Sequence, residues 1–151
     1  MAKLCRLCKL CDRFDTQVFT FQLAASILRE NTPDLYSREF YYGNQIWTIS
    51  VSRNEKHIIP CLTLCKVSAG LVSKLDYTFS LINSEHFSKN EVQVERCCTF
   101  FVDKSSRGCE TFIGVGDLNS RGFIHSNGEL LLELEMRNIL IYFEQVRFHG
   151  V

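Results

Sequence analysis

Three cysteines near the start of the chain have the spacing of a metal site. Cys5, Cys8 and Cys11 are separated by two residues each, and thiolates at this spacing can bind zinc or an iron–sulfur cluster. No fourth ligand lies nearby, because Asp15 stands where a ferredoxin-type run has its next cysteine. We therefore favour an apolar helix face that uses cysteine as a small hydrophobic residue. A metal site shared with a second chain is the alternative.

A second group of metal-ligating residue types lies further along the chain. His57, Cys61 and Cys65 fall within a run that has the composition of a β-strand. At roughly 3.3 Å per residue, a strand places Cys61 and Cys65 about 13 Å apart along one face. That distance is too long for one tetrahedral ion, so we interpret these thiols as covering a sheet face.

Nucleophilic catalysis by cysteine needs a thiol activated by a neighbouring imidazole, and a third group that orients the imidazole. The spacing of the remaining cysteines and histidines couples none of them in this way. We therefore predict that the protein is not an enzyme and has no cofactor. The thiols considered are Cys97, Cys98 and Cys109, and the imidazoles are His57, His86 and His125.

The composition argues against several classes of partner. Seventeen basic residues balance 17 acidic ones in a chain of 151, whereas nucleic-acid binding requires surplus Lys and Arg. No segment approaches the roughly 20 apolar residues of a membrane span, and the N-terminus has no features of a secretion signal. The eight cysteines are therefore expected to stay reduced. We expect a cytoplasmic location, with a nuclear one also open, and neither nucleic acid nor membrane as a partner.

Apolar residues recur with a period of two through most of the chain, which is typical of half-buried strands. Leu130, Leu132 and Leu134, for example, alternate with polar residues, and the break at residues 42–44 predicts a hairpin. The pattern predicts an all-β fold, an antiparallel β-sandwich of seven to eight strands over residues 17–138. The expected strands are residues 17–23, 36–42, 45–52, 58–67, 75–83, 92–102 and 129–137.

Residues 3–14 differ from the rest because their apolar residues fall at helical spacing. We expect a short N-terminal amphipathic helix within residues 1–16, too short to be stable alone. It could be the end of a coiled coil through which copies of the chain form a homo-oligomer. Residues 139–151 are a C-terminal extension, and for residues 139–148 periodicity does not decide between an extension of the last strand and a short helix. The apolar positions of the expected helix are Leu4, Leu7, Cys8, Cys11 and Phe14.

Several short motifs follow one another along the chain. Ser37 and Phe40 precede the strand that Trp47 begins. The later motifs are Tyr77-Thr78-Phe79-Ser80-Leu81-Ile82-Asn83, Arg107-Gly108-Cys109-Glu110-Thr111-Phe112-Ile113 and Gly122-Phe123-Ile124. The order and spacing of all these motifs resemble the MATH domain, the TRAF-like β-sandwich of receptor adaptors and of several ubiquitin-ligase adaptors. The resemblance covers roughly residues 17–138.

The resemblance implies a protein–protein interaction module that docks short extended peptides on one sheet. Such a peptide adds as a strand, while pockets bind its side chains. The resemblance also implies an adaptor role in ubiquitin-ligase or receptor signalling, with a protein or peptide as the partner. Carried over by position, the peptide-binding residues would be Thr63, Tyr77, Thr99, Arg107, Gly108 and Cys109.

Three of these positions depart from the family pattern. Arg107 stands where the family usually has Trp, Cys109 where an aromatic residue commonly follows the glycine, and Thr99 where peptide-binding members often have Tyr. Aromatic side chains dominate the contact energy at such sites. The peptide could therefore be more polar or acidic and contact Arg107, or the domain could bind through another surface. The functional alternatives are a metal-binding module organised by the N-terminal cysteines and an oligomeric assembly platform with a vestigial groove.

Overall fold

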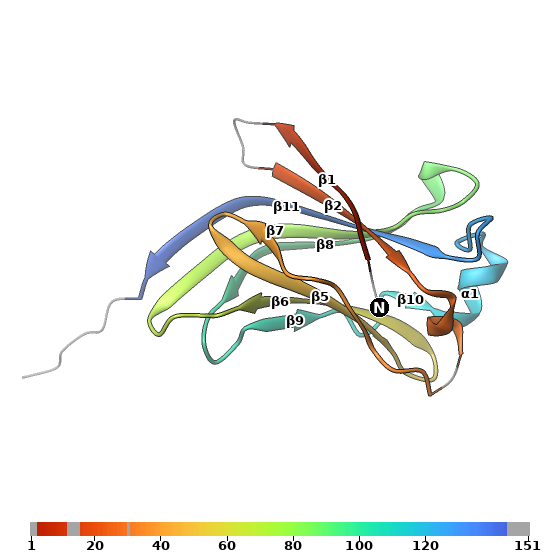
Figure 1. Ribbon diagram of the computed structural model, residues 1–151, viewed down its shortest axis with the longest axis horizontal. Helices are drawn as coiled ribbons and strands as arrows, with labels where there is room; N and C mark the ends of the chain where they lie inside the picture. The colour runs from red at the N-terminus through yellow and green to blue at the C-terminus, as the bar shows by residue number, and fades with distance from the viewer. Residues whose placement is uncertain (1–2, 12–15, 30, 145–151) are drawn as a thin grey trace, which may run out of the picture.

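The chain folds into two antiparallel β-sheets packed face to face, which confirms the expected all-β sandwich (Figure 1). The described residues form five strands in one sheet and six in the other, eleven in all, and not the seven to eight predicted. The number is higher because Lys3–Cys11 and several segments of two or three residues also pair as strands. The computed structural model describes residues 3–11, 16–29 and 31–144, with side chains from residue 16 onward. We call the two layers sheet A and sheet B. Outside the sheets lie two 3₁₀ turns, Ala25–Leu28 and Phe87–Lys89, and one short helix, α1 (Val115–Ser120).

Sheet A has five strands in the order β1-β2-β11-β7-β8, and each neighbouring pair is antiparallel. Its edges are therefore β1 on one side and β8 on the other. The strands are β1 (Lys3–Cys11), β2 (Thr16–Leu23), β11 (Leu130–Phe143), β7 (Leu71–Leu81) and β8 (Glu91–Phe100).

Sheet B has six strands built around β5 and β6. Its main path runs β10-β6-β5-β3, while β4 also pairs with β5 and β9 also pairs with β6. The strands are β3 (Leu35–Tyr36), β4 (Phe40–Tyr42), β5 (Gln45–Arg53), β6 (His57–Cys65), β9 (Ser106–Gly108) and β10 (Ile113–Gly114).

The core lies between the sheets and is filled by the apolar residues that alternate along each strand. Trp47 of β5 is fully buried and meets the Phe100 ring of β8 edge to face, with the ring centroids 5.1 Å apart. Phe19 of β2 packs against Phe40 of β4 at 4.5 Å. Burying one such side chain stabilises the fold by roughly 1.5–3 kcal/mol. These contacts between sheets explain why the period-two pattern is so regular.

The predicted strands are confirmed with small changes at their ends, and so is the predicted hairpin. Gly43 and Asn44 connect β4 to β5 with φ of 59° and 60°, the two positive values that a type I′ turn requires. The expected strand 36–42 is divided into β3 and β4. Ser37 lies in the gap, where its hydroxyl accepts a hydrogen bond from the Ile49 backbone N–H at 2.9 Å.

The predicted N-terminal helix is wrong over Lys3–Cys11, which form strand β1 instead. β1 pairs with β2 along its length, with register shifts after Leu4 and after Lys9. The pairing satisfies backbone groups along the edge of β2, whereas so short a helix is marginal by itself. The coiled coil expected to end in this segment, and with it the homo-oligomer through this segment, therefore has no helix over these residues.

The C-terminal segment is also part of sheet A. β11 continues to Phe143 and pairs with β7 as far as Leu71, beyond a register shift between Arg137 and Leu140. β11 and β7 run side by side to one end of the molecule (Figure 1). Residues 139–143 are therefore strand, which the periodicity left undecided.

Candidate functional site

The short strand β9 brings part of the predicted site together on the outer surface of sheet B. It pairs with β6, so that Ser106 lies opposite Thr63 and Gly108 lies opposite Cys61. The hydroxyl oxygens of Thr63 and Ser106 are 2.8 Å apart and hydrogen-bonded. Because opposite residues in a strand pair share a face, these four residues form one surface, which is solvent-exposed at β9.

Their neighbours on β5 and β6 extend this surface without adding charge. The outward residues of the two strands are half-buried Ser, Thr, Cys and Ile, with His57 at the end of β6, and none of them is Lys, Arg, Asp or Glu. Two exposed tyrosines of β3 and β4, Tyr36 and Tyr41, lie opposite Ser50 and Ile46 of β5. We call this surface the sheet-B face, comprising Ile46, Thr48, Ser50, Ser52, Ile59, Cys61, Thr63, Cys65, Ser106 and Gly108.

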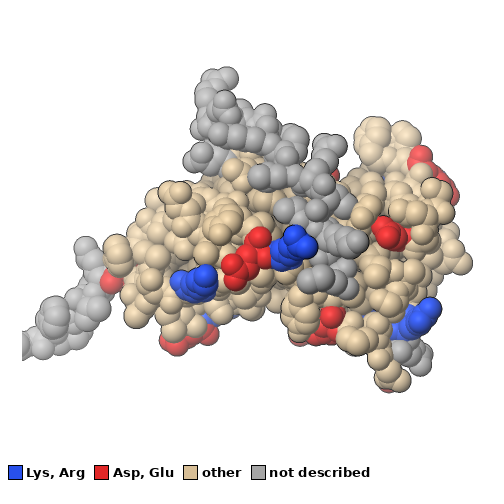
Figure 2. Space-filling model, in the orientation of Figure 1, with Lys and Arg blue, Asp and Glu red and all other residues tan. Residues whose placement is uncertain are grey.

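The outer surface of sheet A differs because charged residues project from its central strands. Lys74 and Asp76 of β7 and Glu133, Glu135 and Arg137 of β11 occupy outward positions there. Over the view in Figure 2, acidic and basic residues lie near one another, with no broad patch of either sign. Since a docked peptide must displace water from its site, and charged groups resist losing water, the sheet-B face is the better candidate.

Among the described strands, β9 pairs with β6 alone, so its other edge is free beside this face. The Leu64 N–H donates to the Ser105 carbonyl at 2.8 Å, and the Cys109 N–H donates to the Pro60 carbonyl at 3.1 Å. In an antiparallel pair, hydrogen-bonded and non-bonded positions alternate. The backbone groups of residues 106 and 108 therefore point away from β6, toward a strand that could be added there.

Arg107 lies between these two residues and points to the opposite side of the strand. It pairs with Leu62, which is fully buried on the inner side of sheet B. Its Nε donates to the Thr99 carbonyl at 3.1 Å, and its guanidinium carbon is 5.8 Å from the centre of the Phe100 ring. Arg107 therefore joins the edge of sheet B to β8 of sheet A, and its charge is directed away from the sheet-B face.

The other predicted residues do not lie on the sheet-B face either. Tyr77 is 3% exposed, and its ring packs edge to face on Phe79. Burial raises the pKa of Tyr77 well above its usual range. Thr99 lies opposite Lys74, on the outward side of sheet A, and contributes only its carbonyl. Cys109 is partly buried against the core. Only Thr63 and Gly108 of the six are on the sheet-B face.

Sequence reasoning missed Ser106 as a member of this face, and it placed Cys61 on a sheet face without counting it among the peptide-binding residues. The signal was present, because Ser106 is two residues before Gly108, and residues two apart on a strand share a side. Cys61 likewise shares a side with Thr63. The family pattern drew attention instead to Arg107, whose side chain points away from the sheet-B face, while its chain neighbours Ser106 and Gly108 lie on that face.

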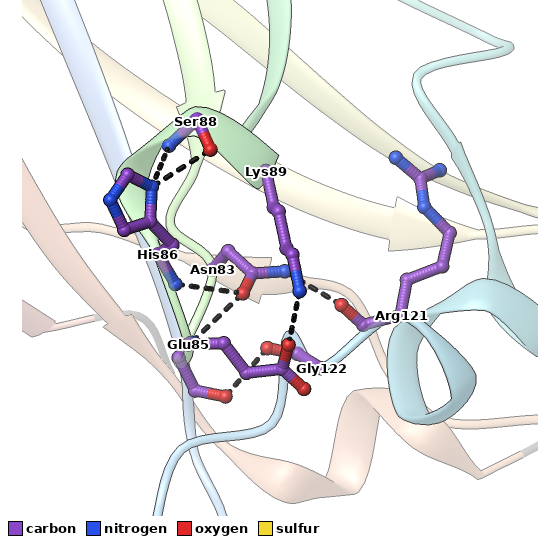
Figure 3. A network of polar contacts seen from close by, with 8 residues as sticks. Asn83, Glu85, His86, Ser88, Lys89, Arg121 and Gly122 are labelled. Carbon is purple, nitrogen blue, oxygen red and sulfur yellow. Dashed lines mark hydrogen bonds and ion pairs between the residues drawn. The ribbon is translucent and has the colours of Figure 1, made fainter.

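A second polar cluster closes the end of the sandwich near α1 (Figure 3). The Asn83 side chain is 6% exposed, and it donates to the Arg121 carbonyl at 2.6 Å while accepting from the Glu85 N–H at 2.9 Å. A hydrogen bond from Lys89 at 2.6 Å lowers the pKa of Glu85. Each of these groups holds the loop between β7 and β8, so we interpret the cluster as a structural brace.

The metal sites considered from the sequence gain no support. On a strand, three residues span about 10 Å, so β1 separates the backbones of Cys5 and Cys8 more widely than a helix would. The side chains of Cys5, Cys8 and Cys11 lie outside the described ones. Among the side chains that are described, no three of the metal-binding types His, Cys, Asp and Glu are grouped closely enough to hold an ion.

No family model matches this chain, and no curated protein matches it. The MATH resemblance therefore depends on the motifs and the sandwich architecture. Within the described ranges, no helix has both the length and the apolar character needed to cross a membrane.

Proposed function

We propose that the protein is a protein–protein interaction module that docks an extended peptide segment of its partner along the free edge of β9. The observation that carries the proposal is the combination of this edge with Gly108, whose lack of a side chain leaves the sheet-B face beside the edge uncovered. An added strand would hydrogen-bond to the backbone of residues 106 and 108. Its side chains on one side would then lie over the sheet-B face.

The chemistry of the sheet-B face favours an uncharged peptide. The Thr63 and Ser106 hydroxyls can donate and accept hydrogen bonds, and the thiols beside them are small and weakly polar. The face offers no counter-charge for an acidic side chain, because Arg107 is directed to Thr99 and Phe100. This arrangement favours a polar peptide over an acidic one, and the peptide would not contact Arg107 as the sequence had led us to expect.

The MATH resemblance and the sandwich together support an adaptor role, in which the docked segment belongs to a ubiquitin-ligase substrate or to a receptor tail. Aromatic anchors give most interfaces their affinity, and the departures at Thr99, Arg107 and Cys109 leave this site with fewer of them. We therefore expect single peptides to bind weakly, with a Kd on the order of micromolar or higher.

A peptide array probed with wild-type protein and a Gly108→Leu variant tests the proposal. Gly108 has no positive φ, and a Cβ there would meet its nearest neighbour at an ordinary 3.6 Å. The substitution should thus leave the fold intact while its side chain projects over the sheet-B face beside Cys61, where the side chains of a docked peptide would lie. Ser80→Leu, on the outer surface of sheet A, is the matched control.

We expect peptides that bind the wild type to lose at least about tenfold in affinity, or 1.4 kcal/mol, in Gly108→Leu and to be unaffected by Ser80→Leu. If no peptide binds the wild type, or if both variants bind equally well, docking at this edge is refuted. The sheet-B face would then fit the alternative of an assembly platform.

A further inference from the structure

A single carboxylate connects irregularities in two neighbouring strands of sheet A. Asp76 lies in β7, between β8 and β11, and both of its oxygens are hydrogen-bonded. One accepts from the Cys97 backbone N–H at 2.7 Å, and the other accepts from the Asn138 side-chain amide at 3.0 Å. Cys97 and Asn138 have φ of 53° and 57°, and each lies at a register shift opposite β7. Both have the features of a β-bulge, which inserts one extra residue into a strand.

The bulge in β8 decides which of its later side chains enter the core. Before the bulge, Glu95 lies opposite Tyr77, on the inner side of sheet A. After it, Cys98 lies opposite Leu75 and Phe100 lies opposite Ser73, so the inward positions change from odd to even numbers. A one-residue slip in a strand moves every side chain to the other face. The bulge therefore buries Phe100 completely and exposes Cys97.

The sequence of β8 specifies this register only weakly. Cys97 and Cys98 are adjacent, and Phe100 is followed by Phe101. A straight strand continuing from Glu95 would place Cys97 opposite Leu75, so a cysteine would face the core in either register. The hydrogen bond from the Cys97 N–H to Asp76 belongs to the bulged register, because there the extra residue turns its N–H to the Asp76 side chain instead of the β7 backbone.

The bulged register also sets the contacts that hold β9. Arg107, the middle residue of β9, bonds to the Thr99 carbonyl and lies over the Phe100 ring. Both contacts come from β8 immediately after the bulge. A slip of one residue would turn the Phe100 ring outward and move the Thr99 carbonyl away from the edge that faces Arg107.

We propose that Asp76 is a positioning residue for the docking site and acts on it through β8. Asp76 fixes the register of β8, and this register places the Thr99 and Phe100 groups that Arg107 of β9 contacts. Asp76 touches neither β9 nor the sheet-B face. The importance of the residue for docking depends on the proposed function, but the register it fixes does not.

The adjacent cysteines provide a direct test of the register. In the wild type, N-ethylmaleimide should alkylate the exposed Cys97, while Cys98, 4% exposed, is protected. Site-resolved mass spectrometry of Asp76→Ala should show Cys98 labelling about tenfold faster or more, because the protecting register is less populated. Asp76→Asn keeps an oxygen for the Cys97 N–H and should resemble the wild type. Asn138→Ala is the control, since it removes the other partner of Asp76 and should leave Cys98 protected.

Hydrogen exchange measures the second step without a ligand. The amides of Leu64 and Cys109, which bond across the β6–β9 pair, should exchange about tenfold faster in Asp76→Ala than in Asn138→Ala. If Asp76→Ala does not fold, Asp76→Val replaces it, because Val lacks the oxygens and favours strands. If Asp76 had only a general structural role, Asp76→Ala and Asn138→Ala would accelerate the exchange of these amides to the same extent.

The proposal is overturned if Cys98 stays protected without the carboxylate, or if Cys98 becomes reactive while the β6–β9 amides do not change. Failure of the proposed function would be distinguishable, because it would appear as absence of peptide binding in the wild type. Labelling and exchange would still report the register of β8 in that case.

Discussion

The β4–β5 turn offers a sharp test of how the end of β11 is placed. Gly43 has a φ of 59°, and a Cβ added to it would lie 2.6 Å from Cδ1 and 2.8 Å from Cγ2 of Ile139. Ile139 follows the β11 bulge and packs on the core. Gly43→Ala should therefore destabilise the fold through backbone strain and through collision with Ile139.

The structure allows the two contributions to be separated. An Ala in the left-handed region costs roughly 1–2 kcal/mol. Gly70 has a φ of 80° with no atom within 4 Å of its would-be Cβ, so Gly70→Ala should show the backbone strain alone. Overpacking adds typically 1–3 kcal/mol, so Gly43→Ala should reduce the free energy of unfolding by roughly 2–5 kcal/mol.

Urea denaturation of the two variants, and of a double-mutant cycle with Ile139→Ala, measures these quantities. In the Ile139→Ala background, the cost of Gly43→Ala should fall to about that of Gly70→Ala, because the colliding atoms are gone. The reasoning is refuted if Gly43→Ala costs no more than Gly70→Ala, or if Ile139→Ala leaves its cost unchanged.

Three further predictions concern buried or shared polar groups. The Ser73 hydroxyl is buried without a hydrogen-bond partner among the described residues. Ser73→Ala should therefore increase the free energy of unfolding by about 1 kcal/mol and raise the urea midpoint; a lower midpoint would contradict this. Hydrogen bonds from Asn138 and from Cys97 lower the pKa of Asp76 below its ordinary 3.8. The charged Asp76 carboxylate therefore stabilises the folded state at pH values above 3.8, and this stabilisation is lost as the pH falls through the lower pKa of the folded state. The difference in stability between wild type and Asp76→Asn should shrink in urea titrations below about pH 4; a constant difference would oppose the assignment. Asn83→Ala should cost roughly 2–3 kcal/mol, because it leaves several backbone groups unpaired, and an unchanged thermal midpoint would show that the brace is dispensable.

Most of the fold could be predicted from the sequence because its strands are buried on one side. Alternation of apolar and polar residues predicts β2, β5, β6, β7, β8 and β11, since burial on one face imposes a period of two. The tight turn at Gly43 and Asn44 is equally local, because few residues tolerate two consecutive positive φ values. For β1 the same approach failed, as apolar residues three apart suit a helix and only pairing with β2 makes the segment a strand.

The candidate site was less predictable, because side-chain direction depends on strand pairing. Thr63 and Gly108 share a face through the register of β6 with β9, which no local pattern contains. The direction of the Arg107 side chain follows from the same register, since its partner Leu62 is on the inner side of the sheet. An aspartate in the middle of a strand, where this residue is disfavoured, was the available signal for Asp76.

The sequence by itself determined that this chain forms an all-β structure, because a period of two buries one side of each strand and leaves the other in water. The tertiary structure decided which residues share a surface. Bulges at Cys97 and Asn138 reverse the inward side within β8 and β11, and they are held by Asp76 from a third strand. Such contacts join residues 21 and 62 positions apart, beyond the range over which periodicity carries information.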